Sequence, residues 1–240
     1  IDLAAWRASG LAVHACFDDD YPQQLRDIRE MPPLLFTQGV RRPDHRAVAV
    51  VGSRAATERG LAVARTIAAE LVERDVTVVS GLAAGVDTAA HEATLAAGGR
   101  TVAVIGTGLR RHYPPGNAEL QARIAEVGLV VSQFWPDTPP AQRNFPIRNA
   151  VMSGYSAATV VVEAGWRSGA RIQARLALQH GRPVILTDLV MHNDWARAFA
   201  EKPGVYVVHG IPALLTAVDT ILRDHPVPTD LESFPDLVPR

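Results

Sequence analysis

The sequence AVAVVGSR at residues 47–54 predicts a buried parallel strand that delivers a tight turn to the start of a helix. The strand is almost continuously apolar, as strands covered on both faces are, and apolar residues at helical spacing follow it. Backbone N–H groups and the positive end of the helix dipole meet at such a turn and favour anions. Arg54 adds a positive charge there. We therefore expect an anion-binding turn, with later loops gathered at the same edge of one sheet.

The pattern of an apolar strand followed by a helix-spaced segment recurs along the rest of the chain. Strands are predicted at residues 48–51, 76–79, 101–105, 129–132, 159–162, 184–186 and 205–208. Strands that alternate with helices form a parallel sheet covered on both faces, joined by right-handed crossovers. The sequence therefore predicts an α/β fold of the doubly wound, mostly parallel, Rossmann-like type, with helices on both faces.

Three regions are expected from the change in regularity along the chain. Residues 1–46 form an N-terminal preface or small subdomain, residues 47–225 form the Rossmann-like domain, and the proline-rich residues 226–240 form an irregular tail. Within the preface, residues 34–36 follow two prolines without being interrupted by one, which favours an edge strand.

Charge is unevenly distributed, although the net charge is only −1. Residues 100–183 carry ten arginines against four acidic residues, whereas residues 188–240 carry eight acidic residues against four basic ones. This segregation suits an anionic ligand along one face, although all but one of the 24 basic residues are arginine, which equally indicates a compositional preference. The single cysteine fits a reducing compartment, and no apolar run approaches the roughly 18 residues that cross a membrane. We expect a cytoplasmic protein without membrane contact.

The turns at the strand ends argue against several ligand and enzyme classes. The first turn is GSRAAT rather than GxGxxG, and Ser80 and Gly81 follow the second strand where a ribose-binding acid is expected. GxxxxGK[ST], GxSxG and HExxH are absent, so neither a cofactor nor a metal is expected, and a metal role for His91 is disfavoured. Glu163 is the best candidate for a general acid or base. A carboxylate that orients Arg54 or a loop amide is the more expected role.

The loop at residues 142–149, QRNFPIRN, combines arginines, amides and one aromatic residue. Arg143 and Arg148 are suited to neutralise phosphates. The face of Phe145 is suited to stack on an unpaired base, a contact worth about 1–3 kcal/mol. Equally, Phe145 could fill the core where the loop re-enters the sheet. The residues alone do not decide between these two roles.

Six segments form a series of motifs in register over residues 12–186: DDDYPQQLRDIREMPPLLFTQG, VAVVGSR, VTVVSGLAAGVDTAAHEATLAAGGRTVAVIGTGL, HYPPGN, NFPIRN and VVVEAGWRSGARIQARLAL. In these segments the sequence resembles the DNA-processing protein A (DprA/Smf) family. The resemblance implies a non-enzymatic protein that binds single-stranded DNA and forms a homodimer. It also implies a recombination mediator that helps to load the RecA recombinase in natural transformation.

The resemblance further implies which residues contact DNA. The family's pocket uses the arginine of the GSR turn and the aromatic and arginine residues of its FPxRN loop. With the matching turn residues and nearby arginines, the predicted contacts are Gly52, Ser53, Arg54, Gly81, Arg143, Phe145, Arg148, Asn149, Ser168, Gly169 and Arg171. Ala150 stands where the family commonly has a second arginine, and Arg171 is expected to restore that charge. The family's VPG turn and Asn-Leu-Ile motif are absent after residue 186.

Two other functions are compatible with such a crevice. One is a nucleoside-monophosphate phosphoribohydrolase, whose PGGxGTxxE motif occupies the same strand end. Gln173 stands about where that enzyme class has its catalytic glutamate, so the chemistry is not expected. The other is a nucleotide-binding sensor module, which needs the crevice and no reaction.

Overall fold

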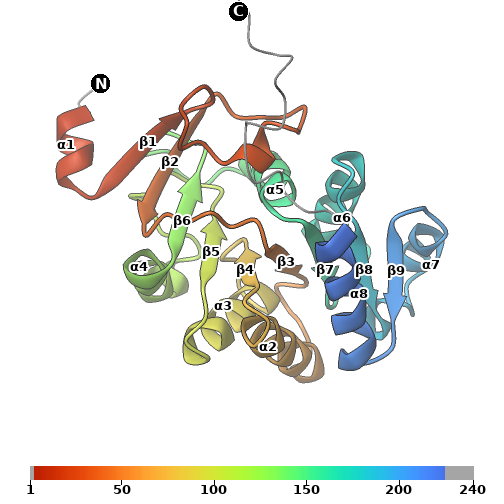
Figure 1. The fold of residues 1–240 in the computed structure, drawn as a ribbon. Coiled ribbons are helices and arrows are strands. Elements are labelled where there is room, and N and C mark those ends of the chain that lie inside the picture. The colour runs from red at the N-terminus through yellow and green to blue at the C-terminus, as the bar shows by residue number, and fades with distance from the viewer. Residues whose placement is uncertain (1–2, 225–240) are drawn as a thin grey trace, which may run out of the picture.

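The computed structural model describes residues 3–224, which form a nine-stranded sheet covered by helices on both faces (Figure 1). The sheet order is β1-β2-β6-β5-β4-β3-β7-β8-β9, and the strands from β3 to β9 are parallel to one another. The predicted doubly wound α/β fold is therefore confirmed. The strands are β1 Leu11–Ala15, β2 Leu34–Gly39, β3 Ala47–Val51, β4 Thr77–Ser80, β5 Thr101–Val104, β6 Leu129–Ser132, β7 Ala158–Val161, β8 Val184–Thr187 and β9 Val205–Val208.

Alternate residues of the central strand β3 pack on opposite faces of the sheet. Val48 and Val50 contact the cluster built from α2, α3 and α8, whereas Ala47, Ala49 and Val51 contact the one built from α5, α6 and α7. Both faces of β3 are buried, which explains its continuous apolar sequence. The helices are α1 Leu3–Ala8, α2 Glu58–Val72, α3 Val86–Ala96, α4 Ala118–Val127, α5 Asn144–Tyr155, α6 Gly169–Gln179, α7 Asp194–Ala200 and α8 Ile211–Asp224.

The direction of strand addition reverses at β3. The chain adds β4, β5 and β6 on one side of β3, then returns to place β7, β8 and β9 on the other side. Ligands of open α/β sheets bind outside the carboxyl ends of the strands at such a reversal. The fold thus places the expected site where β3 and β7 end side by side.

The N-terminal segment extends the sheet in the opposite direction. β2 pairs antiparallel with both β1 and β6, so β1 is the edge strand and the expectation that residues 34–36 form an edge strand is wrong. β1 itself is absent from the predicted strands. The proposed boundary at residue 46 falls immediately before β3 and stays a prediction, and the predicted tail lies outside the described residues.

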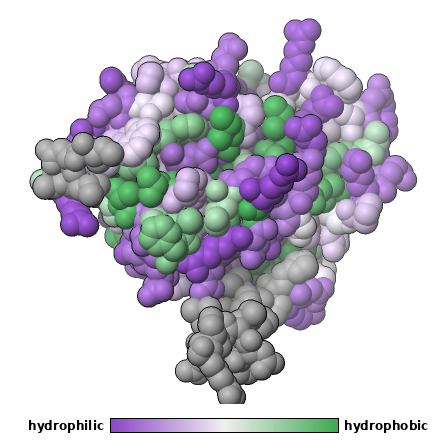
Figure 2. Space-filling model, turned by 90° about the horizontal axis from the view of Figure 1, so that it is seen from above, coloured by the Kyte–Doolittle hydropathy of each residue, from purple (hydrophilic) through white to green (hydrophobic). Residues whose placement is uncertain are grey.

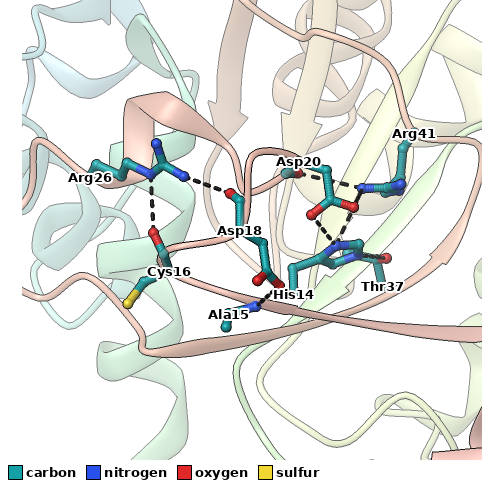
Figure 3. A network of polar contacts seen from close by, with 8 residues as sticks. All are labelled: His14, Ala15, Cys16, Asp18, Asp20, Arg26, Thr37 and Arg41. Carbon is teal, nitrogen blue, oxygen red and sulfur yellow. Dashed lines mark hydrogen bonds and ion pairs between the residues drawn. The ribbon is translucent and has the colours of Figure 1, made fainter. Parts of the chain in front are cut away.

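A polar network around His14 holds this segment together (Figure 3). The buried His14 in β1 bonds Thr37 Oγ1 in β2 through Nε2 at 2.9 Å and the carboxylate of Asp20 through Nδ1 at 3.2 Å. Arg41 donates to the other Asp20 oxygen at 2.5 Å. Although burial opposes it, hydrogen bonding from His14 and Arg41 lowers the pKa of the Asp20 carboxyl. The network joins both strands of the hairpin to the turn that follows β1.

The segment at residues 142–149 is helical for most of its length. α5 begins at Asn144, so the loop expected at residues 142–149 is wrong from residue 144 onward. Proline is tolerated in a first helical turn, because N–H groups there have no intrahelical partner. Phe145 and Arg148 therefore project from a rigid helix.

The surface seen from above carries hydrophobic residues in separate patches among hydrophilic ones (Figure 2). None of the helices formed by residues 3–224 combines the length and the apolar character needed to cross a membrane.

Candidate functional site

A groove of about 650 Å³ opens at the carboxyl ends of β3 and β7. Its lining includes the turn after β3, the first two turns of α5 and the start of α6. Among the predicted contacts, it brings together Gly52, Ser53, Arg54, Phe145, Arg148, Asn149, Ser168 and Gly169. These eight residues therefore line one groove, and their contact with DNA stays a prediction.

The turn after β3 is fixed by close backbone packing. Ser53 N–H donates to the carbonyl of Glu163 at 2.6 Å, and Val86 N–H donates to the carbonyl of Ser53 at 3.2 Å. A Cβ on Gly52 would lie 2.5 Å from Val86 Cγ2 and 2.9 Å from the Glu163 carbonyl, so a side chain has no room there. The packing leaves Arg54 exposed at the mouth of the groove.

Arg54 and two aromatic rings form one wall. The Arg54 guanidinium carbon lies 5.2 Å from the Phe145 ring centroid, within range of a cation–π contact. Phe145 lies 5.4 Å from Tyr113, which is 38% exposed. Phe145 is half-buried and lines the groove rather than filling the core, so the alternative of a core-filling ring is not supported. The wall offers two π-faces next to a cation.

Arg148 lies beneath the groove, only 5% exposed. Its Nη1 donates to the carbonyls of Gly81 and Val104, each at 2.6 Å, and its Nε donates to Asn149 Oδ1 at 3.1 Å. Burial lowers the pKa of Arg148 to about 10, with nearby Asp87 opposing the shift, so the side chain stays charged at neutral pH. Its hydrogen bonds tie the ends of β4 and β5 to α5.

Asp87 supplies the buried negative charge near Arg148. The residue is 6% exposed, and its carboxylate accepts from the N–H groups of Gly81 at 3.1 Å and Ala83 at 3.3 Å. Burial raises the pKa of Asp87, while Arg148 and these backbone donors favour its charged form. Asp87 thus lies near Arg148 below the groove, whereas Arg54 and Arg167 are exposed at its mouth.

Glu163 is not positioned as a general acid or base. Its carboxylate accepts from the backbone N–H of Thr57 at 3.1 Å and from the Thr57 hydroxyl at 2.7 Å. Thr57 in turn caps α2 by accepting from Gly60 N–H at 3.1 Å. Glu163 therefore orients a loop amide at a helix start, the more expected of its two roles.

The start of α6 closes the groove on the side of β7. Ser168 Oγ accepts from Ala170 N–H at 3.2 Å, and Asn149 Nδ2 donates to the Gly169 carbonyl at 3.3 Å. α6 is 11 residues long, and its N-terminus lines the groove. The positive end of its dipole favours an anion at this position.

Three predicted contacts lie outside the groove. Gly81 lines a smaller hollow beside it, together with Arg54, Phe145 and Arg148. Arg143 is exposed at the start of α5 and lines neither hollow. Arg171 lines another adjoining hollow, so it does not bring a charge to the groove in place of the one absent at Ala150.

Several groove residues are absent from the predicted contacts, among them Tyr113 and Arg167. Tyr113 belongs to the HYPPGN motif and Arg167 to the turn after β7, so both lie in segments that the sequence already marked. Tyr113 lines the groove and packs against Phe145, which lies far from it in the sequence.

Within residues 3–224, His, Cys, Asp and Glu form no group of three that could hold a metal ion. His91, for which the sequence disfavours a metal role, is fully buried. Its Nδ1 forms a hydrogen bond with Thr101 Oγ1 at 2.6 Å. Burial lowers its pKa to about 3, which keeps the ring neutral.

Comparison with known proteins identifies the chain's relatives. Residues 12–201 match the family model for DNA recombination-mediator protein A. Protein Smf of Synechocystis is 37% identical over 226 residues, which cover 91% of this chain and 53% of that protein. The chain spans about half the length of several curated relatives that it matches.

Two solved structures share the fold. DNA processing protein A (DprA) from Streptococcus pneumoniae superposes with a TM-score of 0.78 at 36% identity, covering 90% of this chain and 78% of that one. DNA processing protein A from Helicobacter pylori, whose structure was described for its single-stranded DNA binding mode, superposes with a TM-score of 0.78 at 24% identity, covering 90% and 97%. The family is described as a recombination mediator rather than as an enzyme, in line with the expectation from the sequence.

Proposed function

The chain belongs to the DNA recombination-mediator protein A family, and on that basis we propose that it binds single-stranded DNA in the groove between β3 and β7. The observation that carries the proposal is the wall formed by Arg54, Phe145 and Tyr113 beside the exposed Arg167. Cations neutralise phosphates, and aromatic faces stack on unpaired bases whatever their identity. The site thus combines the two contacts that sequence-tolerant binding of a single strand requires.

The same features favour a single strand over a duplex. Base stacking on Phe145 or Tyr113 needs a base whose face is free, and in a duplex both faces of each base are stacked. The positive end of the α6 dipole, which lines the groove, favours a phosphate there without sequence preference. We therefore propose binding without a chemical reaction.

The biological setting follows from the family. We propose that the protein acts in the cytoplasm as a recombination mediator that helps to load RecA onto incoming single strands in natural transformation, as a homodimer. The family match supports the mediator role. A measurement of the mass in solution tests the homodimer.

The decisive experiment titrates labelled single-stranded and double-stranded oligonucleotides of the same sequence at two salt concentrations. We expect tighter binding of the single strand, with an affinity that falls as salt rises, because bound cations release counterions from phosphates. Equal affinity for both forms, or no salt dependence, would contradict the proposal.

A nucleotide-binding role is the second candidate. The groove volume of about 650 Å³ falls in the range of about 300–1,000 Å³ for small-molecule pockets. If a mononucleotide displaces a labelled oligonucleotide at comparable concentration, the sensor role is favoured. A phosphoribohydrolase is disfavoured, because Gln173 in the groove carries no carboxylate. Release of free base from a nucleoside monophosphate would revive it.

A further inference from the structure

A second hollow of about 580 Å³ continues from the groove past the start of α6. The two share Arg167 and Ser168 in their linings, so a ligand leaving the groove on this side enters the hollow directly. The hollow lies between the turn after β7 and the helices α6 and α7. The motif at the start of α6 supplies part of its lining, whereas Trp195, Phe199 and Lys202 come from a segment outside the quoted motifs.

An exposed indole is held in place at the entrance to this hollow. Trp166 is 64% exposed, and the guanidinium carbon of Arg171 lies 4.1 Å from its ring centroid. Arg171 Nη1 also donates to the backbone carbonyl of Trp166. On its other side Arg171 lies 5.3 Å from the ring of Trp195, which is buried and donates to the Ala164 carbonyl at 3.2 Å. The cation fixes the Trp166 ring against a buried support, and most of the ring surface remains open to solvent.

The charge of the hollow has one sign. Its lining contains Arg167, Arg171, Arg175 and Lys202 and no carboxylate. In the part of the chain that the structure describes, Arg167, Arg175 and Lys202 take part in no ion pair. Uncompensated cations around an open aromatic face fit an anionic ligand that also carries rings.

We infer that the hollow is a second subsite for the same single strand, in which a base beyond the groove stacks on Trp166 and adjacent phosphates lie near Arg175 and Lys202. This inference rests on the proposed binding of single-stranded DNA in the groove. A second copy of the chain fits the hollow less well. A two-fold interface centred on it would face four cations with the same four cations.

The test measures affinity against oligonucleotide length. Oligo-deoxythymidines from about 4 to about 16 nucleotides, the range typical of single-strand sites, are titrated by fluorescence anisotropy. For the wild-type protein we expect affinity to rise with length beyond what the groove alone holds. Trp166→Ala should abolish that rise, weakening the longest oligomer by about 5- to 100-fold, the value of stacking one base on an aromatic ring. It should leave the shortest oligomer unaffected.

Three variants make the result specific. Trp166→Phe retains a ring and should restore most of the length dependence. Lys202→Ala should reduce the salt dependence for the longest oligomer but not for the shortest. Trp135→Ala, which removes another exposed indole outside both the groove and the hollow, should leave the length dependence intact.

The outcomes separate the two proposals. If the short oligomer binds and the rise with length survives Trp166→Ala, the second subsite is wrong and the groove stands. If no oligomer binds the wild-type protein, both are wrong. A change of mass in solution caused by Trp166→Ala, with the length dependence intact, would assign the hollow to contact between copies and overturn the inference.

Discussion

The guanidinium of Arg148 fills the space that a side chain at Gly81 would need. A Cβ built on Gly81 would lie 2.1 Å from Arg148 Nη1, and the same nitrogen donates to the Gly81 carbonyl at 2.6 Å. The end of β4 and the second turn of α5 are therefore matched to each other. The glycine makes room for a cation, and the cation satisfies the carbonyl of the glycine.

Gly81→Ala should destabilise the protein. Because Arg148 is buried and bonded to two carbonyls, it cannot swing aside freely, and overpacking of this kind costs about 1–3 kcal/mol. Urea unfolding measures the change. Gly116→Ala is the matched control, since no heavy atom lies within 4 Å of its added Cβ. Equal effects of the two substitutions would show that Arg148 is not tightly held.

Arg148→Ala should lower the free energy of unfolding by at least about 2 kcal/mol, because it leaves the Gly81 and Val104 carbonyls without a donor. Thermal unfolding with and without an oligonucleotide distinguishes this effect from a loss of DNA contact. A variant as stable as the wild type that nevertheless binds DNA poorly would assign Arg148 a direct contact instead.

Arg54→Ala is the cleaner test of binding, because the side chain is exposed. We expect roughly tenfold weaker binding of single-stranded DNA, the loss of one charge-assisted contact worth about 1.5 kcal/mol. The slope of log affinity against log salt should become shallower by about 0.7. Arg65→Ala, an exposed arginine on α2 outside the groove, should change neither quantity.

Phe145→Ala should weaken single-strand binding by about 1–3 kcal/mol, because it removes a stacking face and the ring that positions Arg54 and Tyr113. Phe145→Tyr keeps the face and should bind nearly as well as the wild type. Anisotropy titrations of both variants test this, and a tyrosine variant as weak as the alanine variant would argue against stacking.

His91 should make the fold sensitive to mild acid. Burial holds its pKa at about 3 in the folded state, whereas an unfolded histidine titrates near about 6.5. The contribution of the neutral His91 to the free energy of unfolding is therefore complete above about pH 6.5. As pH falls below it, the unfolded state takes up a proton and the free energy of unfolding drops by up to about 1.4 kcal/mol per pH unit.

Urea unfolding between about pH 7 and about pH 5 measures this dependence. His91→Gln should show a shallower decline than the wild type. His192→Gln removes an exposed histidine and should retain the wild-type decline. If the free energy of unfolding falls equally with pH in both variants, His91 is protonated within the fold.

The parallel part of the fold was predictable because its strands are buried on both faces and carry nearly unbroken apolar runs. β1 was not, because its sequence LAVHA includes a histidine. His14 becomes acceptable in a buried position only through Thr37 and Asp20. No local pattern in the sequence predicts that Thr37 and Asp20 are the partners of His14.

The residues of the candidate site also differ in how far the sequence predicts them. Arg54 follows from its turn, because the strand ending at residue 51 and the helix after it fix where the side chain emerges. Arg148 was predicted as a contact with DNA, which stays a prediction, and the structure shows in addition that it donates to carbonyls 67 and 44 residues away in the chain. The sequence alone does not distinguish an arginine that binds phosphate from one that hydrogen-bonds to the ends of strands. Only the packing of α5 on β4 and β5 distinguishes them.

The pairing of β2 with β6 imposes an order on biosynthesis. β2 ends at residue 39, but the strand that covers its inner edge begins at residue 129. At translation rates of about 5–20 residues per second, that partner is made roughly 5–20 s later. Until then the hairpin of β1 and β2 has an open edge that another nascent chain could occupy. β2 thus leaves the ribosome before the strand that pairs with its second edge has been made.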